Sequence, residues 1–193
     1  LNFVFELKGA GRNSPQWKNA VDVDTYLSNA ALRTVGLPIT DLVRRFRTDG
    51  YFMYPPRDPN NPGTQYALTT GNFATITPME EALVVVDGRF PEPFVSLLRE
   101  GSTIEAMASE EFAAGFGVQV GDTYSLRTDN GQIPITIAGL WRPADPLAPY
   151  WDVKRDNYLF VHEESYAGII SDRVDDELNN VVWTITADGS SLH

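Results

Sequence analysis

The stretch that decides the fold runs from Glu105 to Pro143 and reads EAMASEEFAAGFGVQVGDTYSLRTDNGQIPITIAGLWRP. Its order of residue types predicts a strand, a short helix, a glycine turn and a hairpin. Ser109 is suited to cap the helix, because its hydroxyl can accept a hydrogen bond from an otherwise unpaired amide of the first turn. Gly115 and Gly117 bracket the end of the helix, where a residue with positive φ is common. The helix is therefore expected to be short.

The second half of this stretch predicts a β-hairpin. Asp129-Asn130-Gly131 supplies the turn, since Asn-Gly tolerates the two positive φ angles that match the twist of paired strands. The same three residues fit a calcium loop poorly, because the repeated oxygen ligands and the distant glutamate of an EF-hand are missing. Pro134 in the return strand, Ile133 to Leu140, cannot donate to a ladder. This strand is therefore expected at a sheet edge, or unpaired at the proline.

The composition excludes several classes of partner and site. The 193 residues include 26 acidic and 15 basic side chains, so the net charge of −11 repels nucleic acid and anionic lipid surfaces. The sequence has no cysteine, which excludes disulfides and thiolate chemistry. The longest apolar run, Ala82 to Val86, is far shorter than the ~20 residues that cross a bilayer. Because the sequence starts at Leu1 without a signal-like segment, we expect a piece of a longer protein, with an anchor outside it.

The remaining segments mix strands and helices without a regular βαβ alternation or repeat, which favours an α+β fold of mixed, strand-rich sheets with a few short helices. Strands are expected over 1–7, 51–54, 69–77, 82–86, 158–162 and 181–187, and a short helix over 163–170. Residues 21–32 fit either a strand or a strand running into a helical turn. The whole chain is expected to form one domain of two lobes, with 102–142 inserted between 1–101 and 143–193.

A second helix is predicted over residues 37–46, with Thr40 as its cap. Arg44, Arg45 and Arg47 then fall near the negative end of this helix, where basic side chains are favoured. Solvated arginines are the expected reading, because no glycine-rich phosphate loop lies nearby to make them a ligand-binding cluster.

Candidate catalytic residues are few, and none forms a recognisable constellation. The two histidines, His162 and His193, do not make a cluster, so a serine triad or a zinc site would depend on His162 alone. Carboxylates recur in Asp22 with Asp24, Glu110 with Glu111, and Asp175-Asp176-Glu177, and a carboxylate hydrolase using Asp175 and Asp176 is the third reading of the chain. No nucleotide-binding or hydrolase motif is present. We therefore expect a non-catalytic chain without cofactor or metal.

Aromatic side chains in a proline-punctuated loop, RPADPLAPYW over 142–151, are the candidate binding residues. Tyr150 and Trp151 have the amphipathic rings that stack on a sugar or on a protein partner. The alternative for both is structural, because aromatic residues in such a loop often plug the end of a small core. A second loop by composition, PPRDPNNPG over 55–63, carries no comparable aromatic pair.

The order of motifs over 104–162 resembles a known family. A strand is followed by Ser109-Glu110-Glu111-Phe112-Ala113, by Val120-Gly121-Asp122-Thr123, by a hairpin, by the strand Ile135 to Leu140 and by Leu159-Phe160-Val161. This order is similar to the MacB-like periplasmic core domain, the extracytoplasmic domain between the first and second membrane helices of FtsX-like ABC transporter permeases. The match covers about the central third of the chain, and the two proline-rich loops depart from the family pattern.

The resemblance implies a mechanical role at the cell membrane, on its extracytoplasmic side. A cytoplasmic ABC ATPase subunit would drive the motion, transmembrane helices of the same permease would carry it, and this domain would move a lipoprotein, peptide or drug substrate or control a partner. A second permease protomer is a further expected partner, and nucleic acid is not. ATP would bind elsewhere, so no cofactor is expected on this chain.

A secreted glycan- or protein-binding module that uses Tyr150 and Trp151 is the alternative to the permease domain. The two readings differ in the full-length protein, because only the permease has spanning helices near this segment.

Overall fold

The computed structural model describes residues 1–9, 16–31, 36, 38–57, 65–94, 102–151, 157–170, 178–188 and 190 of the chain. They have the predicted α+β fold, with one mixed, strand-rich sheet and short helices. The strands are β1 (Asn2–Lys8), β2 (Ile39–Tyr54), β3 (Thr69–Thr77), β4 (Leu83–Gly88), β5 (Ile104–Ser109), β6 (Thr123–Thr128), β7 (Gly131–Pro143), β8 (Tyr158–Phe160) and β9 (Asn180–Ala187). The helices are α1 (Trp17–Tyr26), α3 (Met79–Ala82), α4 (Glu110–Phe116) and α5 (Glu163–Ser165), with π-helical turns η2 (Leu27–Ala31) after α1 and η3 (Tyr166–Ile170) after α5.

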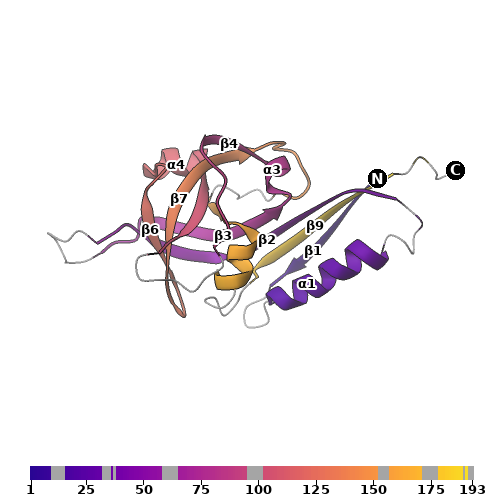
Figure 1. The fold of residues 1–193 in the computed structure, drawn as a ribbon, viewed down its shortest axis with the longest axis horizontal. Helices are drawn as coiled ribbons and strands as arrows, with labels where there is room; N and C mark the ends of the chain where they lie inside the picture. The colour runs from indigo at the N-terminus through magenta and orange to yellow at the C-terminus, as the bar shows by residue number, and fades with distance from the viewer. Residues whose placement is uncertain are drawn as a thin grey trace.

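The strands form one continuous sheet in the order β1-β9-β2-β3-β8-β5-β7-β4. β6 lies off this path and pairs with both β2 and β7. The strands β2, β3, β8, β5, β7 and β6 therefore close into a ring on the left of Figure 1, while β9 and β1 extend β2 to the right. Strands from all three predicted lobe segments share this sheet, and the division into lobes stays a prediction.

β2 joins the ring to the β1–β9 pair. Residues 39–47 of β2 pair with β9, residues 52–54 pair with β6, and β3 runs along the other edge. The register against β3 shifts between Arg47 and Gly50, where β2 passes from one partner to the other. An irregularity of this kind increases local twist, which suits a strand that belongs to two parts of the sheet.

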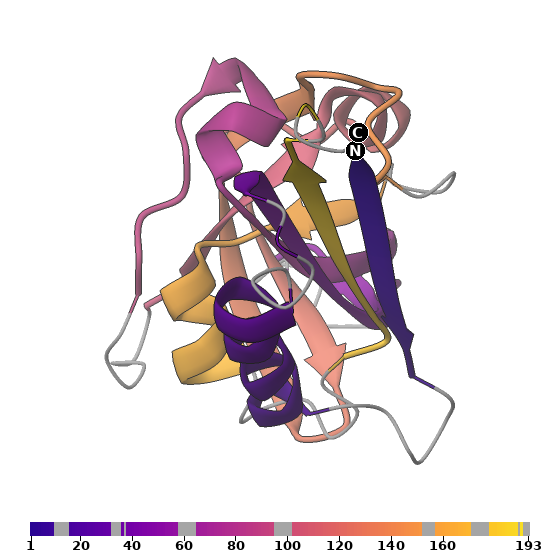
Figure 2. The ribbon, with the colours of Figure 1, turned by 90° about the vertical axis from the view of Figure 1, so that its right-hand side faces the viewer.

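Aromatic side chains attach α1 to the sheet. The ring of Trp17 lies 4.9 Å from Phe46 on β2 and 5.2 Å from Tyr166 on η3, measured between centroids. Phe46 in turn meets Trp183 of β9 edge-on at 6.2 Å. Such pairs add to the stabilisation that apolar burial supplies. α1 is therefore fixed along the strands that project from the ring, as Figure 2 shows from the end of the molecule.

The stretch from Glu105 to Pro143 folds largely as its residues predict. The Ser109 hydroxyl accepts a hydrogen bond of 3.0 Å from the Phe112 amide, which confirms the predicted cap of α4. Gly117 ends α4 with a φ of 71°, in the left-handed region that favours glycine. These signals succeed because each depends on residues only a few positions apart.

The hairpin turn lies where predicted but is of another type. Asp129 and Asn130 connect Thr128 of β6 to Gly131 of β7. Positive φ angles in the described residues occur only at glycines, so Asn130 does not adopt the left-handed conformation that the predicted turn requires. Gly131 alone takes it, with a φ of 125°.

The expectation of an edge strand around Pro134 is wrong for β7 as a whole, because β7 pairs with β6, β5 and β4. Pro134 itself still has no ladder hydrogen bond to donate, as expected. Pro134 pairs with Ser125 on one side, and the pairing with β5 on the other side starts one residue later, at Ile135. The missing N–H therefore falls just ahead of the β5 ladder.

The helix predicted from Thr40 is wrong, because residues 39–54 form the strand β2. Phe46 and Val43 are both buried, but on opposite faces of a strand. Phe46 packs against Trp17 of α1, and Val43 packs in a second cluster with Ile76 and Trp141. Pairing with β9 and β3 along most of its length outweighs the local capping signal at Thr40, since long-range partners decide short ambiguous segments.

Most of the other predicted elements are confirmed. The expected strands at 1–7, 69–77, 82–86, 158–162 and 181–187 correspond to β1, β3, β4, β8 and β9, and 51–54 is the end of β2. The expected helix at 163–170 is α5 with η3. The strand expected within 21–32 is wrong, because the described residues of this segment belong to the helix α1 and to the turn η2. Among the described residues, no helix is long and apolar enough to cross a bilayer.

Candidate functional site

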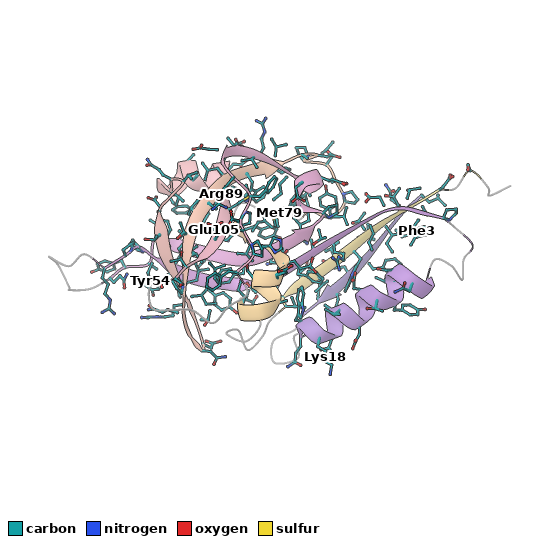
Figure 3. All side chains as sticks on the ribbon, viewed as in Figure 1. Phe3, Lys18, Tyr54, Met79, Arg89 and Glu105 are labelled. Carbon is teal, nitrogen blue, oxygen red and sulfur yellow. The ribbon has the colours of Figure 1, made fainter. Side chains whose placement is uncertain are left out.

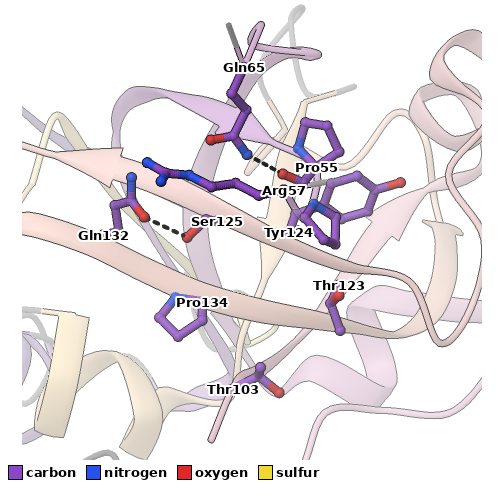
Figure 4. Close-up of a pocket in the computed structure, with 10 residues that line it drawn as sticks. Pro55, Arg57, Gln65, Thr103, Thr123, Tyr124, Ser125, Gln132 and Pro134 are labelled. Atoms are coloured by element: carbon purple, nitrogen blue, oxygen red, sulfur yellow. Dashed lines mark hydrogen bonds between the residues drawn. The ribbon is translucent and has the colours of Figure 1, made fainter. Parts of the chain in front are cut away.

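A cavity of about 410 Å³ lies against the β6–β7 hairpin, beneath the chain that leaves β2 (Figure 4). Leu126, Ile133 and Ile135 of the hairpin are buried, so Thr123, Ser125, Gln132 and Pro134, which alternate with them, face the cavity, whereas Tyr124 lies on the face of Leu126 and packs against the core as well. The lining residues are Pro55, Pro56, Arg57 and Gln65 after β2, Thr103 before β5, and Thr123, Tyr124, Ser125, Gln132 and Pro134 on the hairpin. The cavity is thus lined by hydroxyls, amides and proline rings.

Hydrogen bonds hold the walls of this cavity. The Gln65 side-chain amide donates to the Pro55 carbonyl, and the Ser125 hydroxyl lies 3.5 Å from the Gln132 amide oxygen (Figure 4). Next to the cavity, the hydroxyls of Thr103 and Thr136 lie 2.5 Å apart. The hydrogen bond from Gln65 to Pro55 therefore joins two parts of the chain that follows β2.

Arg57 is the one charged residue among the described residues that line the cavity. Its guanidinium makes no hydrogen bond or ion pair with another described residue. The described lining of this cavity has no carboxylate, although Asp122 lines the hollow beside it. In a chain of net charge −11, the arginine here favours an anionic group on whatever binds beside it.

A second hollow of about 280 Å³ adjoins the first one. Its lining residues are Pro55, Pro56, Gly121, Asp122, Thr123 and Tyr124. Because the two hollows share the proline pair and Thr123-Tyr124, they form one groove along the end of β6.

Tyr124 has a strongly shifted pKa. Burial disfavours the phenolate, and the Asp122 carboxylate accepts a hydrogen bond of 3.1 Å from the phenolic O–H. Burial first, and then this hydrogen bond and the negative charge of Asp122, raise the pKa of Tyr124 to about 12.

We expect the Tyr124 shift to make the chain less stable between pH 10 and 12. The unfolded chain loses the phenolic proton near the ordinary pKa of about 10, whereas the folded chain keeps it up to about 12. Stability from this group is therefore intact below pH 10 and falls as pH rises through the window. The difference in absorbance at 295 nm between the chain and Tyr124→Phe measures the titration. Asp122→Asn should lower the midpoint, and an unchanged midpoint would contradict the role of Asp122.

The predicted binding residues Tyr150 and Trp151 pack against the core. The Trp151 ring stacks on the fully buried Trp141 at 5.7 Å, with 13° between the planes, and its indole N–H donates to the Asp145 carbonyl at 2.9 Å. Tyr150 meets Trp151 edge-on at 5.1 Å. Burial, followed by the charges of Asp145, Asp41 and Glu81, raises the pKa of Tyr150. Both rings are partly exposed, and their role in partner binding stays a prediction.

The prediction of solvated arginines is wrong, because Arg45 is fully buried within the sheet. Its guanidinium donates to the Tyr158 hydroxyl at 2.5 Å and to the Asn180 side-chain oxygen at 2.6 Å. The Asn180 amide donates onward to the Glu6 carboxylate at 2.6 Å. β2, β8, β9 and β1 are therefore linked by one polar network, which the sequence could not reveal because its members are far apart in the chain.

The two neighbouring arginines are also paired. Arg44 donates to Asp24 of α1 at 2.6 Å and to Glu163 of α5 at 3.1 Å. Arg47 donates to the Asn179 side-chain oxygen at 2.8 Å. The three arginines of β2 thus hold α1, α5 and the segment before β9 in place.

A surface ion pair connects the end of β4 to β5. Arg89 donates two hydrogen bonds to the Glu105 carboxylate, at 2.7 and 2.5 Å, and the two side chains lie together in Figure 3. The hydrogen bonds from Arg89 lower the pKa of Glu105, with a further contribution from the Glu92 amide. This fork geometry joins the residue that follows β4 to β5.

The candidate histidine and carboxylates that the structure describes serve as helix caps, first-turn residues or ion-pair partners. His162 caps α5, because its Nδ1 accepts from the Glu164 amide at 3.2 Å. Glu110 and Glu111 occupy the first turn of α4, where the helix dipole favours acidic side chains. Asp24 pairs with Arg44, while 175–177 and His193 lie outside the described residues. Within the part of the chain that the structure describes, no three metal-ligating side chains come together.

Among known proteins, the chain is similar to solved structures and to no family model or curated sequence. No protein-family model matches the chain, and no curated protein matches its sequence. Among solved structures, the chain is similar to the crystal structure of a domain of a provisionally named permease protein from Porphyromonas gingivalis, with a TM-score of 0.47 and 13% sequence identity. The similarity covers 84% of this chain and 63% of that one.

Proposed function

We propose that this chain is the extracytoplasmic domain of an ABC transporter permease, of the MacB-like kind found in FtsX-like permeases. The proposal starts from the motif order over 104–162, which resembles that family. On this view the chain is not an enzyme: it transmits motion, and ATP is hydrolysed on a cytoplasmic subunit.

The observation that carries the proposal is the pairing of β1 with β9. These strands are antiparallel over their whole length, from Asn2 opposite Thr186 to Lys8 opposite Asn180. The chain therefore enters through β1 and leaves through β9 at the same end of the molecule (Figure 1). Adjacent entering and leaving strands fit a domain carried between two membrane helices, although termini also lie close together in many other domains.

The sheet offers a path along which such a domain would transmit movement. β9 pairs with β1 on one edge and with β2 on the other, and β2 continues into the closed ring. A displacement of membrane helices would act on β1 and β9 together and reach the ring through β2. The ring would then move a lipoprotein, peptide or drug substrate, or act on a partner protein.

A labelling experiment tests where the domain resides. Leu147 is 90% exposed and these 193 residues contain no cysteine, so Leu147→Cys introduces one accessible thiol into this domain; any cysteine elsewhere in the full-length protein is first replaced by serine. We expect a membrane-impermeant maleimide to label it in intact cells, and Leu126→Cys, at a fully buried position, to stay unlabelled in the same cells. The labelled protein should sediment with membranes and co-purify with an ABC ATPase.

Two outcomes would count against the permease. Labelling of Leu147→Cys only after lysis would place the domain in the cytoplasm. Recovery of the full-length protein in the extracellular soluble fraction would favour the secreted binding module.

A further inference from the structure

The pairing of β6 with β2 ends early. β6 pairs with β7 from Thr128 back to Thr123, but its pairing with β2 stops at Ser125, opposite Tyr54. Thr123 and Tyr124, the two residues of β6 before Ser125, therefore pair with β7 alone among the described strands. The groove described above lies at this point.

The backbone of Thr123 faces the unpaired side. The amide of Ile137 donates to the Asp122 carbonyl at 2.9 Å, so Asp122 bonds across to the β7 chain. Backbone groups along a strand point alternately to its two neighbours, and the N–H and C=O of Thr123 are therefore directed toward the continuation of β2. That continuation is Pro55-Pro56, which has no N–H to offer, and neither of these proline carbonyls accepts a hydrogen bond from the Thr123 amide.

The groove at this edge has the parts that an added strand uses. Thr123 supplies one backbone donor and one acceptor, and the rings of Pro55, Pro56 and Tyr124 supply apolar surface. Arg57 adds a positive charge close by, above the hairpin (Figure 4). Extended peptides bind exposed sheet edges through backbone hydrogen bonds, with flanking pockets for side chains.

We propose that this groove binds an extended peptide, which adds to β6 beside Thr123 and places a carboxylate on Arg57. The carboxylate is either the C-terminus of the peptide or an acidic side chain, since Arg57 recognises both. The site goes beyond the transport role and does not depend on it, because binding to the isolated 193-residue chain tests it without membrane or ATPase.

The probe is the strand-forming pentapeptide acetyl-TVTVA with a free C-terminus, titrated into the ¹⁵N-labelled chain up to about 10 mM. We expect the amide signals of Thr123 and Tyr124 to shift, and hydrogen exchange of the Thr123 amide to slow, because the peptide provides its missing acceptor. Acetyl-TVTVA amide and acetyl-TVTVD amide separate the two sources of the carboxylate. If only the peptide with the free C-terminus binds, Arg57 recognises a C-terminal carboxylate. If acetyl-TVTVD amide binds as well, Arg57 recognises any carboxylate.

Two variants measure the role of each group. Arg57→Gln should weaken the acid peptide about tenfold, since it removes a charge-assisted hydrogen bond, and leave the weaker TVTVA amide unchanged. Arg142→Gln removes the same charge from an exposed position on β7 outside the groove and should have no effect. Thr123→Pro removes the N–H and should abolish binding of all three peptides; if this variant unfolds, the exchange measurement decides the same point.

The proposal is overturned if no peptide shifts the Thr123 and Tyr124 signals, or if the shifts lie on another face of the chain. It is also overturned if Arg57→Gln and Arg142→Gln weaken the acid peptide equally, because the charge would then act at long range and not in the groove.

Discussion

Arg45→Ala is expected to lower the free energy of unfolding by about 3–5 kcal/mol, the range for large-to-small changes in a well-packed core. Arg45 is fully buried, and its guanidinium donates to the Tyr158 hydroxyl and the Asn180 side-chain oxygen. Truncation leaves both acceptors buried without their donor, at a cost of about 1–3 kcal/mol for each group. Urea unfolding followed by tryptophan fluorescence measures the change.

Arg45→Lys separates the charge from its geometry. Lysine keeps the positive charge but cannot supply the two-pronged guanidinium that reaches Tyr158 and Asn180 together, so we expect a loss between that of Arg45→Ala and zero. Arg142→Ala, at an exposed position of β7, is the matched control and should change stability by less than about 0.5 kcal/mol. A loss below about 1 kcal/mol for Arg45→Ala would show that the network is not part of the stable core.

The opening stretch shows what a sequence can predict here. The Ser109 cap and the positive φ of Gly117 depend on neighbours within a few residues, and both are present in the structure. The hairpin position is right for the same reason. Its turn type is not, because Gly131 takes the positive φ and Asn130 does not.

β2 shows where sequence reasoning fails. Thr40 and the apolar residues after it fit a helix locally, but β2 pairs with β9 more than a hundred residues away and also with β3. The burial of Arg45 follows from that pairing, since its acceptors Tyr158 and Asn180 come from β8 and β9. No pattern around 37–46 encodes these partners.

The groove is assembled in the same way from separate segments. Pro55-Pro56-Arg57 directly after an aromatic strand is the one local signal for it, and composition alone gives only a loop there. Apart from Tyr124, the hairpin residues that complete it alternate with core residues such as Leu126 and Ile133, so the sequence predicts that they face outward but not what lies above them.

The β4–β7 pair depends on a close approach of the two strands at Gly88. This residue ends β4 with a φ of 72° and lies opposite Gly139 of β7. A Cβ at this position would collide with the Ala138 carbonyl oxygen and lie 2.8 Å from the Gly139 Cα. Both atoms belong to the backbone of β7, which pairs with β4, β5 and β6. Moving either atom would therefore cost free energy.

Gly88→Ala is therefore expected to destabilise the chain by about 2–5 kcal/mol, from left-handed backbone strain together with overpacking. Gly117→Ala is the matched control, because Gly117 has a φ of 71° and no atom within 4 Å of an added Cβ. It should show the strain alone, about 1–2 kcal/mol. The difference between the two variants in urea unfolding measures the close approach of β4 to β7. Equal losses would mean that the β4–β7 pair opens to admit a methyl group without cost.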